Sequence, residues 1–206
     1  MNITVFGATG SIGRLVVEQA LAAGHDVTAF TREAARVTTA HDRLQVVEGD
    51  VTDPDACLPA VKGADAVVVA LGAGRKGVVR EAGTRSVVEA MRQAGVRRLV
   101  CQSTLGVGSS RANLDLMWKY VMFGALLRSA YADHVRQEAV VEASDLDWTT
   151  VRPSAFVDES PAPVRHGFDG SERGLTLKIG RDDVAAFVLA QVDDLTYLRR
   201  AVSVSS

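Results

Sequence analysis

Short runs of apolar, often β-branched residues alternate along this chain with stretches in which apolar residues recur at helical spacing. The strand-like runs cover residues 2–6, 26–31, 44–48, 64–70, 97–104, 148–152, 174–179 and 201–204. The helical patterns cover residues 15–21, 33–37, 54–61, 79–94, 132–144 and 182–192. Such alternation predicts an α/β fold with a doubly wound, mainly parallel sheet and helices on both faces. Right-handed crossovers would place a ligand at the carboxyl ends of the strands.

The first strand-like run leads at once into a glycine-rich turn, Gly7-Ala8-Thr9-Gly10-Ser11-Ile12-Gly13, which opens the first helical pattern. Strand, glycine turn, helix and strand in about thirty residues are typical of a dinucleotide-binding unit. Gly7 permits a sharp turn, Gly10 a close approach to a pyrophosphate, and Gly13 tight packing of helix on strand. We expect the amides of Gly10, Ser11 and Ile12 to point at the phosphates, with the helix dipole behind them. The alternative is an ordinary tight turn without a ligand.

The glycine turn resembles the nucleotide loop of the atypical short-chain dehydrogenase/reductase families. It is most similar to the NAD(P)H-binding group that includes the biliverdin reductase B / flavin reductase proteins and the NmrA-like proteins. Further matches are Thr31-Arg32-Glu33, Gly49-Asp50-Val51, Ala70-Leu71-Gly72, Ser103-Thr104, Asp133-His134-Val135-Arg136 and Val151-Arg152-Pro153. The resemblance spans nearly the whole chain and implies a Rossmann-type fold. Because reactions differ within the group, it indicates the cofactor better than the substrate.

The length, net charge and cysteine content of the chain agree with this interpretation. The length of 206 residues fits one NAD(P)-binding domain, 1–206, with substrate-side loops near 105–127 and 154–174. A net charge of −2 argues against a nucleic-acid surface, and no apolar run is long enough to cross a bilayer. Cys57 and Cys101 lack metal-ligand spacing, so we expect no metal site. We therefore expect a cytoplasmic monomer or homodimer that binds a small-molecule substrate.

The end of the second strand indicates which nicotinamide cofactor binds. NAD enzymes place Asp or Glu there to hold the ribose hydroxyls, whereas this chain has Thr31-Arg32. A guanidinium binds a 2′-phosphate through forked, charge-assisted hydrogen bonds, and the Thr31 hydroxyl can add another. We therefore predict that NADP(H) is preferred. NAD(H) remains possible, because Glu33 follows directly and could reach the ribose; Arg32 could also be a solvated surface residue.

The ends of the later strands complete the expected cofactor site. By resemblance, the Asp50 carboxylate accepts from the adenine amino group while Val51 flanks the ring. The alternative is that Asp50 only caps a turn or a helix. Together, the residues that we assign to cofactor binding are Gly7, Thr9, Gly10, Ser11, Ile12, Gly13, Thr31, Arg32, Asp50, Val51, Ala70, Leu71, Gly72 and Pro153.

The catalytic groups are less clear. Most short-chain dehydrogenases use Tyr and Lys four residues apart, and here Tyr120 is followed by Gly124 and Tyr131 by Val135. The remaining candidates for catalysis are Thr104, Ser103 and His134. Each has a structural alternative: the hydroxyls could satisfy loop backbone, and a lone helix histidine is more often structural or exposed.

These observations favour an NADPH-dependent oxidoreductase that transfers hydride to a planar acceptor such as a flavin, quinone or conjugated carbonyl. One alternative is an NmrA-like redox sensor that binds NADP(H) without turnover, which the absent Tyr/Lys pair fits equally well. Another is an enzyme like the sugar-nucleotide epimerases and dehydratases. The apolar stretch 113–127 could form a substrate-pocket lid, a dimer contact or simply core.

Overall fold

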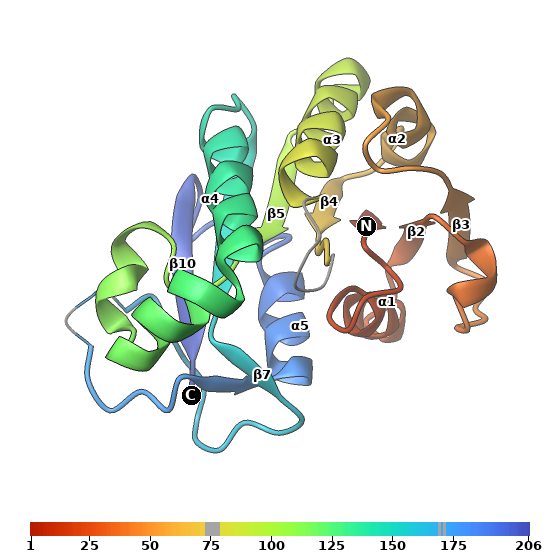
Figure 1. Cartoon of the computed structure of the whole chain (residues 1–206). Helices are drawn as coiled ribbons and strands as arrows, with labels where there is room; N and C mark the ends of the chain where they lie inside the picture. The colour runs from red at the N-terminus through yellow and green to blue at the C-terminus, as the bar shows by residue number, and fades with distance from the viewer. Residues whose placement is uncertain (73–78, 169, 171) are drawn as a thin grey trace.

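An eight-stranded sheet forms the centre of the computed structural model, which describes residues 1–72, 79–168, 170 and 172–206 (Figure 1). The strand order is β3-β2-β1-β4-β5-β6-β10-β8, and every neighbouring pair is parallel except β10 and β8. The strands are β1 (Asn2–Phe6), β2 (Asp26–Thr31), β3 (Leu44–Glu48), β4 (Ala66–Val69), β5 (Arg98–Gln102), β6 (Asp147–Pro153), β8 (Arg165–His166) and β10 (Arg200–Ser205). The predicted doubly wound, mainly parallel sheet is confirmed.

Helices cover both faces of this sheet (Figure 1). Helices α1 and α5 share one apolar cluster with the sheet, and α2, α3 and α4 share the other. Their bounds are α1 (Gly13–Ala22), α2 (Pro54–Val61), α3 (Arg80–Ala94), α4 (Arg128–Glu142) and α5 (Arg181–Ala190), with a short 3₁₀ turn η1 (Ala34–Arg36) after β2. In β1, Ile3 and Val5 pack toward the first cluster and Phe6 toward the second, as the period of two along a strand requires.

Strand β1 pairs with β2 on one side and with β4 on the other, so the chain changes direction across the sheet at this point. In an open α/β sheet, a ligand crevice forms outside the carboxyl ends of the strands at such a switch point. Residues 7–12 and 70–72 leave β1 and β4 at that edge. The topology therefore places the glycine turn where the sequence predicts a ligand.

The structure differs from the sequence pattern in two regions. Residues expected to form an irregular loop make a 3₁₀ helix, η2 (Gly108–Asn113), and a π-helix, η3 (Met117–Leu126), and α4 starts at Arg128 instead of Ala132. The strand expected over 174–179 is confined to β9 (Lys178–Gly180), which pairs with β7 (Ala155–Val157) outside the main sheet. Residues 169 and 171 of the predicted loop 154–174 lie outside the described residues.

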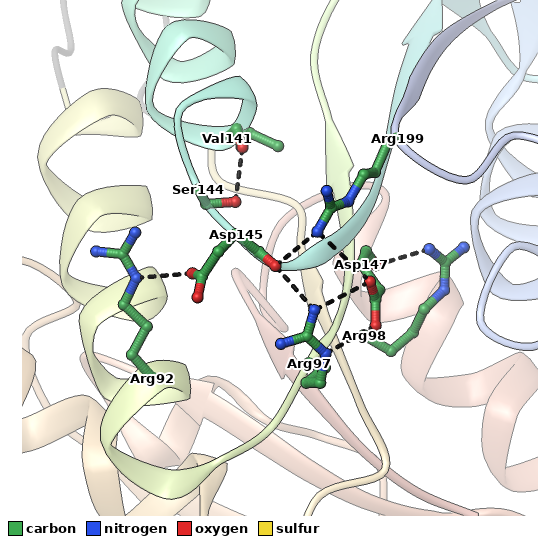
Figure 2. Close-up of polar contacts among 8 residues, drawn as sticks. All are labelled: Arg92, Arg97, Arg98, Val141, Ser144, Asp145, Asp147 and Arg199. Atoms are coloured by element: carbon green, nitrogen blue, oxygen red, sulfur yellow. Dashed lines mark hydrogen bonds and ion pairs between the residues drawn. The ribbon is translucent and has the colours of Figure 1, made fainter.

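A cluster of ion pairs lies at the end of the sheet opposite to the carboxyl ends of the strands, where β5 and β6 begin (Figure 2). Arg97 donates through Nε to Asp147 Oδ2 at 3.0 Å, and Arg92 donates to Asp145 Oδ1 at 3.1 Å. The hydrogen bonds from these arginines hold the pKa values of both carboxyls below their usual range. The same cluster includes Arg199, which donates to the Asp145 carbonyl. Because this edge is remote from the carboxyl ends of the strands, we assign the cluster a structural role.

Candidate functional site

A cleft made of two cavities follows the carboxyl edge of the sheet at the switch point. The larger cavity has a volume of about 390 Å³ and the smaller about 310 Å³. Both are lined by Gly10, Leu71 and Gly72, so they meet over the glycine turn. The two cavities therefore form one elongated site with the turn at its middle, as an extended dinucleotide requires.

Two glycines of the turn are required by its geometry. Gly7 has a φ of +85°, and a Cβ there would lie 2.4 Å from the carbonyl oxygen of Ala70. A Cβ on Gly13 would lie 2.2 Å from the carbonyl oxygen of Gly7. Neither position accepts a side chain without a backbone shift. The close contact of α1 with the first turn is thus built on these two residues.

Of the three amides expected to bind the phosphates, one is already hydrogen-bonded within the turn. The Gly10 N–H donates to the Gly7 carbonyl at 2.9 Å, so it is not free for a phosphate. The amides of Ser11 and Ile12 have no hydrogen-bond partner among the described residues. Both residues line the larger cavity directly before α1, where unpaired amides and the helix dipole favour an anion. The diphosphate of a dinucleotide fits this corner.

The smaller cavity contains the residues that were expected to select the cofactor. Arg32 is exposed at its wall, together with Glu33 and with Arg36 of η1, which the sequence analysis did not single out. The Thr31 hydroxyl donates to the Glu33 carbonyl and accepts from the Glu33 N–H, both at 3.3 Å. This local turn already occupies the hydroxyl expected to reach the 2′-phosphate. The positive charge of the smaller cavity comes from the side chains of Arg32 and Arg36.

Asp50 follows β3 and caps the turn there, which is the alternative that the sequence left open for this residue. Its carboxylate accepts from the backbone N–H and the hydroxyl of Thr52, at 2.9 and 2.8 Å. These hydrogen bonds, with a smaller effect of Arg32, hold the pKa of the Asp50 carboxyl below its usual value. Val51 lines the smaller cavity, and Asp53 caps helix α2 through its carboxylate. The adenine contact of Asp50 stays a prediction.

The larger cavity has an apolar wall. Several of its large apolar residues come from η3, from the segments beside it and from β7: Leu105, Leu114, Trp118, Phe123, Leu127, Phe156 and Leu177. Within η3 itself only Phe123 is buried, whereas Tyr120 and the neighbouring Met117 are 67% and 56% exposed. Simple core packing therefore does not account for this helix. Its inward face instead supplies the aromatic wall of the cavity.

The three catalytic candidates lie in the same cavity. Ser103, Thr104, His134 and the expected cofactor contact Pro153 all line it. The Ser103 hydroxyl is buried and has no partner among the described residues, whereas Thr104 Oγ1 donates weakly to the Leu105 carbonyl at 3.4 Å. A free hydroxyl in a ligand cavity is available to a substrate or a nicotinamide, which makes Ser103 the stronger of the two candidates.

His134 is buried and uncharged at neutral pH. Desolvation and the charge of Arg80 lower the pKa of its imidazole to about 4. Gln137 donates through Nε2 to Thr84 Oγ1, which orients its Oε1 toward His134 Nδ1 at 3.1 Å. This assignment puts the ring proton on Nδ1. A neutral ring in this state is better suited to positioning a ligand than to delivering a proton.

The buried state of His134 predicts a pH dependence of stability. Between pH 6.5 and 4 the His134 imidazole is protonated in the unfolded chain but stays neutral in the folded chain. The free energy of unfolding therefore falls as the pH decreases. Urea unfolding at pH 7 and at pH 5 measures how much the free energy of unfolding falls between the two pH values. In His134→Gln this fall should be smaller than in the wild type by about 2 kcal/mol. The exposed His41→Gln is the matched control. An unchanged pH dependence in His134→Gln would show that this imidazole titrates normally in the folded state.

Three polar residues of the larger cavity were not predicted from the sequence: Arg80, Gln102 and Ser154. Gln102 precedes Ser103 at the end of β5, and Ser154 follows Pro153, so strand-end position was the available signal. Arg80 gave no such signal, because it starts a helix. The described residues contain no group of His, Cys, Asp or Glu that could hold a metal ion. Among them there is also no helix of sufficient length and apolar character to cross a membrane.

The fold and the cleft define a Rossmann-type dinucleotide-binding protein, and comparison with known proteins identifies its family. The match to the NAD(P)H-binding family covers residues 7–195. The chain therefore belongs to the NAD(P)H-binding family. Its solved structural neighbours include an oxidoreductase from Lactococcus lactis, with a TM-score of 0.83 and 20% identity over 99% of this chain and 90% of that one.

Two further solved structures are similar over nearly the full chain. A short-chain dehydrogenase/reductase from Veillonella parvula in complex with NADP has a TM-score of 0.81 and 22% identity, and covers 100% of this chain and 94% of its own. An anaerobilin reductase from Escherichia coli O157:H7 has a TM-score of 0.81 and 23% identity, with coverages of 99% and 96%. At such identities the likeness shows the fold alone.

Two sequence relatives are more similar over shorter stretches. A chloroplastic protein of Arabidopsis thaliana is 30% identical over 171 residues, which cover 78% of this chain and 61% of that protein. A 3-diazoavenalumate denitrifying reductase from a Streptomyces species is 42% identical over 117 residues, which cover 50% of this chain and 38% of that protein. The chain thus spans less than two thirds of the length of these relatives.

Proposed function

We propose that the protein is an NADPH-dependent reductase that transfers hydride to a planar acceptor such as a flavin, a quinone or a conjugated carbonyl. The observation that carries this proposal is the shape of the cleft. A cavity with two exposed arginines and an apolar, aromatic-walled cavity meet at a glycine turn with two unpaired amides. The names of the reductase relatives and the bound NADP in one structural neighbour support it.

The residues of this chain have distinct roles in the proposal. Ser11 and Ile12 bind the diphosphate through their amides, and Arg32 and Arg36 bind a 2′-phosphate at the adenosine end. When bound, NADPH supplies the hydride. Trp118 and Phe123 hold a planar acceptor by apolar contact and exclude water, while the Ser103 hydroxyl orients a carbonyl or amide oxygen. No Tyr/Lys pair is needed where positioning dominates.

The direct test of turnover follows NADPH absorbance with a panel of FMN, riboflavin and simple quinones. We expect consumption of NADPH with at least one planar acceptor and slower consumption after Trp118→Ala, which removes part of the apolar wall. Tyr120→Ala, on the exposed side of the same helix, is the matched control. Tight NADPH binding without consumption across the panel would overturn the reductase proposal.

One observation favours a second function, a redox sensor that binds NADP(H) without turnover. Helix η3 and the residue before it leave five apolar side chains at least half exposed beside the larger cavity: Leu116, Met117, Tyr120, Val121 and Leu126. Such a patch suits a protein partner. The aromatic wall of the cavity suits a planar acceptor better than a sugar nucleotide, so we do not extend the proposal to epimerase-type chemistry.

The cofactor preference gives a prediction of its own. Arg32→Ala should weaken NADPH binding by about ten- to a hundredfold, because a charge-assisted hydrogen bond contributes roughly 1.5–3 kcal/mol. Binding of NADH, which lacks the 2′-phosphate, should change little. Fluorescence titration of both cofactors measures the two affinities. Arg14→Ala is the control, because Arg14 is exposed, pairs with Glu18 and lines neither cavity. An equal loss for NADPH and NADH would contradict the assignment.

A further inference from the structure

Arg80 is a buried cation in the wall of the larger cavity. It begins helix α3, lines the cavity and is only 8% exposed. Its Nε and Nη1 atoms are buried and have no hydrogen-bond partner among the described residues. A buried charged group is normally hydrogen-bonded, because a donor removed from water without a new partner destabilises the fold. These donors therefore call for an acceptor that the described residues do not supply.

The nearest carboxylate, Asp133, is already engaged elsewhere. It accepts from the backbone N–H groups of Arg80 and Glu81 at 3.0 and 3.2 Å, and so caps the start of α3 from helix α4. Its Oδ2 lies 3.6 Å from Arg80 Nη1, beyond hydrogen-bonding distance. Asp133 therefore offsets part of the charge of the guanidinium by this ion pair and leaves Nε and Nη1 without a hydrogen-bond acceptor.

The surroundings of Arg80 favour an anionic ligand. His134 is neutral and close enough for the Arg80 charge to lower its pKa, so it adds no competing positive charge. The hydroxyls of Ser103 and Ser154 line the same cavity and are likewise buried without partners among the described residues. A guanidinium with unpartnered donors, in the same cavity as free hydroxyls, matches a carboxylate, which accepts charge-assisted hydrogen bonds.

We propose that Arg80 binds a carboxylate of the acceptor, so the substrate is a planar, apolar molecule with an acid group at its edge. This inference rests on the proposed function, because it assumes that the larger cavity holds the acceptor. A phosphate of the cofactor is the other source of anionic oxygen. Arg80 is not among the residues around the smaller cavity, where the 2′-phosphate is expected. The diphosphate shares the larger cavity with Arg80, but it already has the amides of Ser11 and Ile12.

The test compares two acceptors that differ in charge and by one methyl group: anthraquinone-2-carboxylate and its methyl ester. Calorimetry with the NADP⁺ complex measures binding, and NADPH oxidation measures turnover. The wild type should bind the acid at least about tenfold more tightly than the ester. Arg80→Met should reduce that preference to about twofold or less, and Arg80→Lys should restore part of it. Arg85→Met, on an exposed position of the same helix, should keep the full preference.

The outcomes separate this inference from the proposed function. Equal binding of acid and ester by the wild type overturns the inference, even where both are reduced and Arg80→Met fails to fold. A preference for the acid without reduction of either compound supports the binding role of Arg80, and the acceptor panel described above then decides the reductase proposal. Loss of NADP⁺ affinity in Arg80→Met, with the acid preference retained, assigns Arg80 to the cofactor and overturns the inference.

Discussion

A Gly10→Asp variant is expected to lose at least about a hundredfold in NADPH affinity and to keep its fold. Gly10 lines both cavities, so Asp at this position adds a negative charge where the cavities meet. Two unit charges about 4 Å apart near a protein surface repel by about 4 kcal/mol, and a diphosphate carries more than one charge. The variant thus tests whether an anion binds at the glycine turn.

Steric effects at Gly10 are separable from charge. A Cβ there would lie 3.1 Å from the Gly7 carbonyl oxygen and 3.8 Å from that of Ala70, which requires a small adjustment. Gly10→Ala should therefore weaken NADPH binding by about tenfold or less, and circular dichroism should report native structure for both variants. Similar affinities of Gly10→Asp and Gly10→Ala would contradict the placement of the diphosphate.

Glu138→Ala is expected to destabilise the protein by about 3–5 kcal/mol, because it leaves a buried charge without its partner. Glu138 on α4 accepts from Arg152 Nε at 3.0 and 3.2 Å and from Nη2 at 2.5 Å, and both side chains are buried. Arg152 directly precedes Pro153 of the cavity wall. The pair therefore holds α4 against β6 beside this wall.

Urea unfolding measures this effect through the change in the free energy of unfolding. The matched control is Arg92→Ala, which breaks the exposed pair with Asp145 and should cost less than about 1 kcal/mol. A loss in Glu138→Ala no larger than in the control would show that the pair is solvated and that α4 packs less closely on β6 than the structure describes.

The sequence was most informative where local chemistry dictates structure. The glycine turn, the buried strands and helix α2 with its proline start all follow from short-range patterns, because strand period and glycine geometry act within a few residues. Most predicted cofactor residues accordingly line the cleft. The engaged amide of Gly10 was missed because an internal hydrogen bond of a turn depends on its three-dimensional shape.

Long-range contacts set the limit of the prediction. Arg80 and Asp133 are 53 residues apart, and only the packing of α4 on α3 brings them together beside His134. Helix η3 has an apolar sequence that fits a core segment, yet it wraps the cavity as a π-helix, a form that sequence periodicity does not indicate. The strand predicted over 174–179 is longer than the strand observed there, β9, which pairs with the short strand β7 outside the main sheet.

A crystal structure of the protein with NADP⁺ tests the central claim most directly. The account predicts the diphosphate within hydrogen-bonding distance of the Ser11 and Ile12 amides, the 2′-phosphate beside Arg32, and the nicotinamide in the larger cavity near Ser103. A diphosphate bound elsewhere, or a glycine turn filled by side chains in the presence of saturating NADP⁺, would contradict it.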